Sequence, residues 1–182
     1  MNSIGDLILV QLTHFEDHRG HFCETYSRSR YIELGIDVEF VQDNQSLSHA
    51  IGTLRGLHFQ TPPAAQAKLV SCVRGAVFDV AVDIRRGSST YGKWEGYELT
   101  AENRHQLYVP VGFAHGFVTL EADSEIVYKC SDYYAPEAEG SVLWNSCGIE
   151  WPLSGGPILS DKDQEAPLLA DFHSPFLYGQ NS

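Results

Sequence analysis

The stretch VFDVAVDI, residues 77–84, is apolar at almost every position. A run of this length and composition is typical of a β-strand that is covered on both faces. Similar short segments, rich in Val, Ile, Phe, Tyr and Leu and separated by Gly, Pro, Asn or Asp, lie on both sides of it. The predicted strands are Leu7–Leu12, Gly20–Tyr26, Val38–Asn44, Gly52–Gln60, Lys68–Val73, Val77–Ile84, Tyr97–Thr100, Gln106–Val109, Gly116–Leu120 and Glu125–Ser131.

Helical patterns are confined to two places. Arg28–Leu34 predicts one or two turns, and Ser160 is a candidate N-cap before acidic residues and the segment Gln164–Leu169. About ten strands at short spacing predict an all-β fold, a β-sandwich or barrel of the jelly-roll type with a few short helices. The chain contains no repeat and no linker, so we expect one domain over residues 1–182, with residues 170–182 as a peripheral tail.

Composition narrows the functional class. Of the 182 residues, 43% are hydrophobic and 12% aromatic, which excludes a disordered or low-complexity protein. Lys and Arg number 12 against 24 Asp and Glu, giving a net charge of −12. Because binding to a phosphate backbone needs a basic surface, nucleic acid and anionic membranes are not expected partners. An anionic ligand would have to meet a local cluster of the few cations.

The sequence contains no recognisable targeting signal. The chain starts without a basic segment, its first apolar stretch (Leu7–Val10) is short, and no segment approaches the ~20 apolar residues of a membrane span. The four cysteines are scattered and form no CxxC pair. We therefore expect a cytoplasmic protein with reduced thiols and no membrane contact.

The motif RGLHFQ, residues 55–60, holds the first candidate for chemistry. In a strand, His58 lies on the opposite face from Leu57 and Phe59. A single histidine among apolar neighbours is more often structural than catalytic. Strict alternation also places Arg55 and His58 on opposite faces, so a site that contains both requires a bulge or a strong twist.

Three other polar residues have ordinary structural explanations when each is taken alone. Lys68 opens an apolar strand, where a lysine discourages edge-to-edge aggregation. Tyr128 alternates with its neighbours as a core tyrosine would, with its hydroxyl hydrogen-bonded. Asp163 lies where the first turn of a helix favours an acidic residue.

A metal site is the alternative suggested by VPVGFAHGF, residues 109–117. A Pro-x-Gly turn that leads to a histidine such as His115 recurs in cupin-type jelly rolls, where histidines surround one metal. Such a site needs three or four ligands, usually including a His-x-His pair. The chain has no His-x-His, and residue 60 is Gln60. We therefore predict no metal, with a site built from His58, His115 and a carboxylate as the alternative.

Taken together, the motifs resemble the dTDP-4-dehydrorhamnose 3,5-epimerase family from about Leu7 to Leu169. The resemblance implies a cupin-like jelly roll, a homodimer and no metal or other cofactor. It also implies inversion of the two carbons that flank the keto group of dTDP-4-dehydro-6-deoxyglucose, on the route to dTDP-L-rhamnose. The strings that carry it follow one another in the family's order: FVQDN (40–44), RGLHFQ (55–60), QAKLV (66–70), the segment 75–117, VYKCSDYYAPE (127–137) and PILSDKDQEAPLL (157–169).

The resemblance assigns roles to particular residues. His58 would be the general base with Asp163 as its carboxylate partner, Lys68 would support the developing enolate, and Tyr128 would be the acid on the opposite face of the sugar. The positions that match substrate contacts are Arg19, Phe22, Glu24, Gln42, Asn44, Arg55, His115, Tyr134, Glu139 and Lys162. In the family, Tyr134 matches a residue that stacks in the thymidine region, and the N-terminal segment reaches the neighbouring subunit's site.

These residue types suit the implied chemistry. A carbon next to a ketone is acidified because the carbanion delocalises onto the oxygen, so epimerisation needs a base, an acid on the other face and a cationic group at the oxygen. Histidine suits the base because its ordinary pKa of ~6.5 leaves it mostly neutral at pH 7, and a carboxylate can orient it. Two alternatives are a mono-epimerase for a related sugar and, in another class, a metal-dependent oxygenase or a non-catalytic sugar-binding protein.

Overall fold

The computed structural model describes residue 4 and residues 6–179. Within these residues the chain forms twelve β-strands, two short α-helices and two 3₁₀ helices. The elements are β1 (Ile8–Gln11), β2 (His14–Asp17), β3 (Gly20–Cys23), α1 (Arg28–Glu33), β4 (Gln42–Ser48), β5 (Leu54–Gln60), β6 (Lys68–Arg74), β7 (Ala76–Asp83), β8 (Trp94–Thr100), β9 (His105–Val109), β10 (Phe113–Thr119), β11 (Ser124–Cys130), η1 (Pro136–Ala138), β12 (Glu139–Ser141), α2 (Asp161–Gln164) and η2 (Leu169–Asp171).

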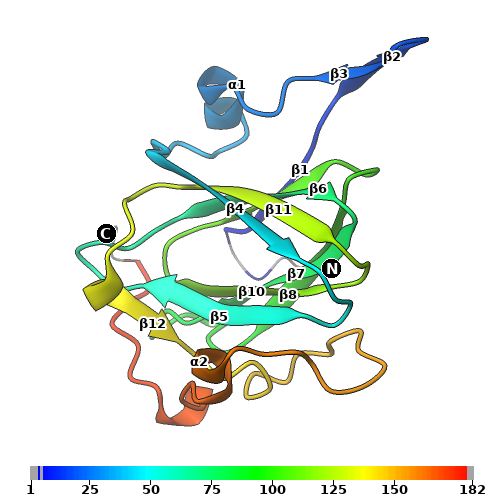
Figure 1. The fold of residues 1–182 in the computed structure, drawn as a ribbon. Coiled ribbons are helices and arrows are strands. Elements are labelled where there is room, and N and C mark those ends of the chain that lie inside the picture. Colours follow the sequence, from blue (N-terminus) through cyan, green and yellow to red (C-terminus); the bar gives the residue numbers. More distant parts are fainter. Residues whose placement is uncertain (1–3, 5, 180–182) are drawn as a thin grey trace.

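Ten of the strands form two five-stranded antiparallel sheets that face each other (Figure 1). We call the sheet with the strand order β1-β9-β6-β11-β4 the upper sheet and the sheet with the order β12-β5-β10-β7-β8 the lower sheet. This arrangement confirms the predicted all-β jelly-roll sandwich with a few short helices. In the described part of the chain, neither helix is long and apolar enough to cross a membrane.

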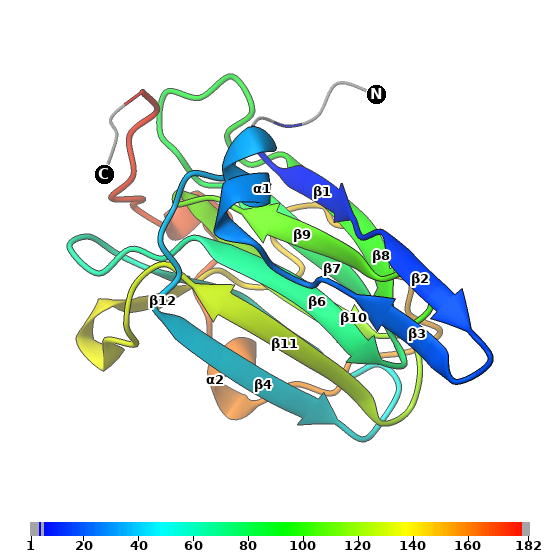
Figure 2. The ribbon, with the colours of Figure 1, turned by 90° about the horizontal axis from the view of Figure 1, so that it is seen from above.

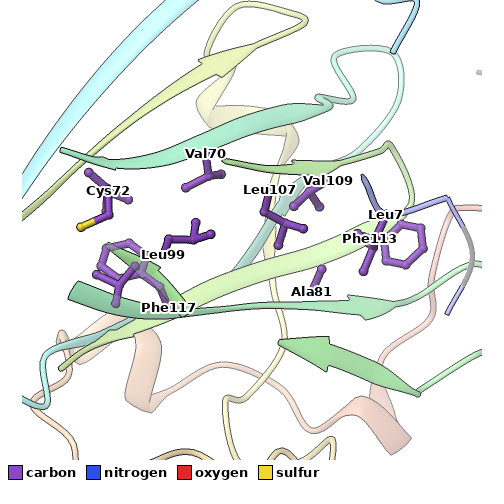
Figure 3. Close-up of a cluster of buried hydrophobic side chains, with 11 residues drawn as sticks. Leu7, Val70, Cys72, Ala81, Leu99, Leu107, Val109, Phe113 and Phe117 are labelled. Atoms are coloured by element: carbon purple, nitrogen blue, oxygen red, sulfur yellow. The ribbon is translucent and has the colours of Figure 1, made fainter. Parts of the chain in front are cut away.

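The main core lies between the two sheets (Figure 3). Val70 and Leu107 from the upper sheet face Ala81 and Phe117 from the lower sheet. On the outer face of the lower sheet, Val80 belongs to a second apolar cluster. Strand β7 is therefore covered on both faces, as its continuous apolar pattern predicts, since each face packs against a different cluster.

Polar side chains interrupt the inward-facing rows of several strands at one end of this core. On β10, His115 alternates with the core residues Phe113 and Phe117. On the upper sheet, Lys68 of β6 stands two residues before Val70, and Tyr128 of β11 packs partly against the same cluster. Because residues two apart in a strand share a face, these polar groups point between the sheets. Polar side chains are unusual in the interior of a sandwich, so their presence there marks a candidate site.

Several elements differ from the prediction. Strand β4 covers Gln42–Ser48 and not Val38–Asn44, because Val38 and Phe40 pack around Tyr31 in a separate apolar cluster before the ladder begins. The helix that follows Ser160 is a single turn. The polar strand β2 and the three-residue strand β12 have no sequence pattern that would have revealed them.

The C-terminal segment packs against the body of the protein up to the last described residues. Phe176 is 6% exposed, and its ring lies 5.9 Å from that of Phe59, whose ring also lies 5.1 Å from that of Phe172. Backbone hydrogen bonds join Arg86 to Phe176 and Tyr178. Phe172 and Phe176, which fall within the predicted tail, pack in the second apolar cluster.

The β2–β3 hairpin projects away from the two sheets (Figures 1 and 2). Phe15 and Phe22 are directly opposed on its two strands, and they are 67% and 70% exposed. Opposed residues of an antiparallel pair share a face, so the hairpin carries an exposed aromatic face. An isolated two-stranded hairpin is marginally stable in water.

Candidate active site

A cavity of about 270 Å³ lies between the sheets, at the polar end of the core. Eight of the predicted site residues line it: Arg55, His58, Lys68, His115, Tyr128, Glu139, Lys162 and Asp163. The remaining lining residues are Ser46, Phe117, Ile126 and Ser160. The structure therefore brings residues from β5, β6, β10, β11, β12 and α2 to one place, although they are spread over more than a hundred positions of the chain.

A β-bulge in RGLHFQ allows Arg55 and His58 to share this cavity. His115 and Phe117 of β10, two residues apart, pair with His58 and Arg55, three residues apart on β5. The extra residue in β5 places Arg55 and His58 on the same face of the strand. This is the bulge that the sequence required for a site containing both residues. Gly56 has φ +129°, and a Cβ there would lie 2.6 Å from Cα of Gly116. Only glycine fits at this close approach of the two backbones.

His58 and Asp163 form a hydrogen-bonded pair. Nε2 of His58 lies 2.5 Å from Oδ1 of Asp163, and the Asp163 side chain is almost fully buried. Ser160 caps α2 by accepting a hydrogen bond from the backbone N–H of Asp163, and its hydroxyl donates to Oδ2 at 2.9 Å. The short helix thus presents the carboxylate to β5, so Asp163 is both a helix-start residue and the partner of His58.

The environment of Asp163 keeps it ionised. Burial alone would raise the pKa of this carboxyl group, but hydrogen bonds from His58, Ser160 and the Gly56 backbone outweigh burial and lower the pKa. Asp163 is therefore a carboxylate at neutral pH. Because it occupies Nε2 of His58, the ring nitrogen available to the cavity is Nδ1, as in the orientation logic of a catalytic triad.

Lys68 and Tyr128 come from the sheet that faces His58. The ammonium nitrogen of Lys68 lies 6.0 Å from the centre of the Tyr128 ring. Burial lowers the pKa of Lys68, while the nearby Cys130, Asp79 and Glu139 oppose that effect. Burial is also the main reason that the pKa of Tyr128 lies above its ordinary value, so this hydroxyl keeps its proton at neutral pH.

A second buried pair joins His115 to Asp79, a residue that the sequence interpretation did not single out. Nε2 of His115 lies 2.9 and 3.0 Å from the two carboxylate oxygens of Asp79, which is completely buried. A charged residue inside an otherwise apolar strand is the signal that could have identified Asp79. The same signal applies to Asp83 on the same strand, which binds Arg85, Ser88 and Thr90.

Five predicted contacts form a chain that ends at Glu139 and Lys162, which line the cavity. The Gln42 side-chain amide donates to Asn44 at 3.1 Å and accepts from the backbone N–H of Tyr134 at 2.9 Å. The Tyr134 hydroxyl in turn donates to Glu139 at 3.2 Å, and Glu139 also pairs with Lys162. Tyr134 is mostly exposed, so its ring is accessible beside Glu139, which lines the cavity.

The N-terminal candidates are not among the residues that line the cavity of their own chain. Arg19 pairs with Asp17 at the tip of the β2–β3 hairpin, and Glu24 pairs with Arg30. Phe22 lies on the exposed aromatic face of the hairpin.

The cavity gathers positive charge in an acidic protein. Arg55, Lys68 and Lys162 all line it, although the chain has only 12 Lys and Arg residues. This local cluster is the feature that an anionic ligand would need. Among the described residues, no three His, Cys, Asp or Glu side chains are grouped closely enough to hold a metal ion.

Comparison with known proteins identifies relatives that cover most of the chain. A family model described as dTDP-4-dehydrorhamnose 3,5-epimerase matches residues 1–171. The dTDP-4-dehydrorhamnose 3,5-epimerase of Salmonella typhimurium is 54% identical over 170 residues, which is 92% of each chain.

Two solved structures place the fold among nucleotide-sugar epimerases. A dTDP-6-deoxy-D-glucose-3,5-epimerase from Legionella pneumophila, in complex with dTDP-4-keto-L-rhamnose, has a TM-score of 0.90 and 47% identity and covers 94% of this chain and 92% of that chain. The 3'-monoepimerase ChmJ from Streptomyces bikiniensis, in complex with dTDP-quinovose, has a TM-score of 0.87 and 40% identity and covers 92% of this chain and 86% of that chain. The chain therefore belongs to the dTDP-4-dehydrorhamnose 3,5-epimerase family of carbohydrate isomerases.

Proposed function

We propose that this protein inverts carbons 3 and 5 of dTDP-4-dehydro-6-deoxy-D-glucose and releases dTDP-4-dehydro-L-rhamnose for dTDP-L-rhamnose synthesis. The observation that carries the proposal is the placement of a carboxylate-backed histidine on one sheet and of Lys68 and Tyr128 on the facing sheet. A sugar bound between the sheets would have a base on one side and an acid on the other. The relatives named as 3,5-epimerases support both the reaction and its substrate.

Each proton transfer then has a defined donor and acceptor. His58 removes the proton next to the keto group through Nδ1, and Asp163 stabilises the imidazolium that forms. The Lys68 ammonium lies on the facing wall and stabilises the negative charge on the keto oxygen, where one preorganised donor is typically worth ~3 kcal/mol. Tyr128 returns a proton to the opposite face of the carbon. These four side chains supply the whole proton-transfer sequence, so the proposal includes no cofactor.

The nucleotide would occupy the rim. Arg55 and Lys162 supply cations for the diphosphate, and Tyr134 presents an exposed ring that can stack on the thymine base. Gln42, Asn44 and Glu139 complete this rim through the hydrogen-bond chain described above, and His115 contacts the sugar.

A mono-epimerase is the second candidate function, because ChmJ, a 3'-monoepimerase, shares the fold at 40% identity. The experiment that separates the two is incubation with dTDP-4-dehydro-6-deoxyglucose in deuterated water, with deuterium counted at each carbon by NMR. We expect incorporation at carbons 3 and 5, because each inversion replaces a carbon-bound proton with one from solvent. Incorporation at one carbon alone would indicate a mono-epimerase. A stoichiometric iron, manganese or zinc ion after purification would favour the metal-dependent alternative.

We also propose that the protein works as a homodimer in which the β2–β3 hairpin completes the neighbouring site. A groove of about 670 Å³ lies on the outer face of the upper sheet, lined by apolar residues such as Leu69, Val73 and Val127. It suits the exposed Phe15 and Phe22 of a second copy, and two-fold symmetry would bury both hairpins at once. Tyr128 lines both this groove and the catalytic cavity, so a hairpin bound there lies close to the substrate.

A mixing experiment tests whether Arg19, Phe22 and Glu24 act in trans. His58→Ala subunits lack the base, and Arg19→Ala subunits lack the proposed hairpin contact. If the hairpin serves the partner's site, each mixed dimer contains one complete site, so reassociated equal mixtures should recover about a quarter of wild-type activity from statistical pairing. Mixtures no more active than the average of the two parent variants would contradict the trans assignment. Sedimentation of each variant checks that it remains dimeric.

The cytoplasm is the compartment that we propose for this reaction. The four cysteines are free in the structure, and Cys72 and Cys130 are buried. Unpaired thiols are typical of proteins in a reducing environment.

A further inference from the structure

Asp79 is a buried carboxylate that the proposed mechanism does not use. Its side chain lies on β7 within the lower sheet and is completely buried, yet no lysine or arginine pairs with it among the described residues. Its partner is the imidazole of His115, through both carboxylate oxygens. A buried carboxylate is costly unless it is hydrogen-bonded and its charge is compensated, so its presence here calls for an explanation.

The position of His115 connects Asp79 to the cavity. His115 is the cross-strand partner of His58, and both histidines line the cavity. Each of them binds a carboxylate through Nε2, which leaves Nδ1 as the nitrogen available to a ligand. The site therefore contains two neighbouring imidazoles that each contact a carboxylate through Nε2, although only His58 is assigned a proton transfer.

Asp79 also acts on Lys68 through its charge. Lys68 is destabilised as an ammonium ion by burial, and the groups that oppose this effect are Cys130, Asp79 and Glu139. Glu139 already pairs with Lys162, and burial raises the pKa of Cys130, which favours the uncharged thiol. Within the part of the chain that the structure describes, Asp79 is thus the one of these two carboxylates that has no lysine or arginine partner.

The other groups that face Lys68 do not replace this charge. Arg55, Lys162 and Tyr128 line the same cavity and carry positive or no charge. Asp163 is a carboxylate, but it is bound to His58 on the lower sheet.

We propose that Asp79 is a positioning residue for the epimerase reaction: it orients His115 so that Nδ1 faces the sugar, and it supplies the negative charge that keeps Lys68 as an ammonium ion beside the keto oxygen. The inference rests on the proposed function for the identity of the reaction. Its two structural consequences, the tautomer of His115 and the charge of Lys68, can be measured without substrate.

The test compares Asp79→Asn with Asp83→Asn. The two residues are on the same strand and equally buried, but Asp83 binds Arg85, Ser88 and Thr90 and does not line the cavity. Lys68 has to be protonated to stabilise the enolate, so exchange activity falls as the pH rises through its pKa. Loss of the Asp79 charge lowers the pKa of Lys68. The alkaline limb of the plot of exchange activity against pH should therefore move toward lower pH by roughly half a pH unit to one pH unit. Asp83→Asn should leave the limb in place.

NMR of the free proteins gives a readout that is independent of catalysis. Side-chain labelled lysine should show the same decrease in the pKa of Lys68 in Asp79→Asn, and nitrogen shifts of wild-type His115 should show the proton on Nε2. An unchanged Lys68 titration, or a neutral His115 with its proton on Nδ1, would overturn the proposal. A shift of equal size in Asp83→Asn would also overturn it. If the NMR results agree but wild-type protein exchanges no deuterium into the sugar, the proposed function fails and the role of Asp79 does not.

Discussion

Replacement of His58 by alanine should lower deuterium exchange at both carbons by roughly 10²- to 10⁴-fold, the usual contribution of a positioned general base. The reason is geometric as well as chemical. His58 is the histidine whose Nε2 is held by Asp163, and Nδ1 is thereby directed to a cavity that also contains Lys68. Without the imidazole, the carbon-bound proton has no acceptor on that face, and Lys68 cannot stabilise an enolate that does not form.

The matched control is an exposed pair of the same two residue types. His49 lies 2.7 Å from Asp123 through Nδ1, but both side chains are largely exposed and neither lines the cavity. His49→Ala should exchange at the wild-type rate. Circular dichroism of His58→Ala should match the wild type, since this side chain is partly exposed and lies outside the three apolar clusters. Exchange by His58→Ala within tenfold of wild type would mean that another group removes the proton.

Most strands of the two main sheets could be predicted because their composition follows from burial. Strand β7 is apolar at every position except Asp79 and Asp83 because both of its faces are covered, and such a pattern has few alternatives. Strand β4 shows the opposite case. Its sequence, QDNQSLS, is polar because it lies at the edge of the upper sheet, where its side chains alternate between exposed and partly buried positions. Such a strand has no alternation of apolar and polar residues, so the sequence predicted a strand that begins at the apolar residues before it, from Val38.

The site could be predicted only in part from the local pattern. His58 and Arg55 occur in one motif, but their common orientation depends on a bulge that requires a second glycine, Gly116, on another strand. Asp163 lies 105 residues from His58 in the chain, and nothing in a four-residue helix indicates which strand it will meet. The order of motifs shared with the family supplied that pairing, whereas spacing alone could not.

Asp79 and the hairpin mark two further limits. Asp79 and Asp83 are both buried acids in one strand, and only the three-dimensional neighbours, His115 for one and Arg85 for the other, separate a site residue from a structural one. Phe22 is exposed in a single chain, and the reason for an aromatic residue at this position becomes clear only if a second copy covers it.

Replacement of Tyr128 by phenylalanine should separate the two halves of the reaction. The variant retains His58, Asp163 and Lys68, so the enolate still forms, but the group that donates a proton from the facing sheet is absent. The imidazolium of His58 exchanges its proton with solvent and can return a deuteron to the face from which the proton was taken. Deuterium should therefore enter recovered substrate at a rate within about tenfold of wild type, while inversion falls roughly 10²- to 10⁴-fold, as expected for loss of a general acid.

The control for this variant is Tyr97→Phe. Tyr97 packs partly against the same apolar cluster as Tyr128, and its hydroxyl bonds Glu95 outside the cavity lining. Any effect of losing a half-buried phenol on packing should be similar in the two variants, so a difference in inversion rate isolates the proton donor. If Tyr128→Phe loses exchange and inversion to the same degree, the tyrosine is needed for enolate formation itself. If it inverts both carbons at the wild-type rate, water or another residue protonates the enolate, and the opposition of the two sheets is not the basis of stereochemical inversion.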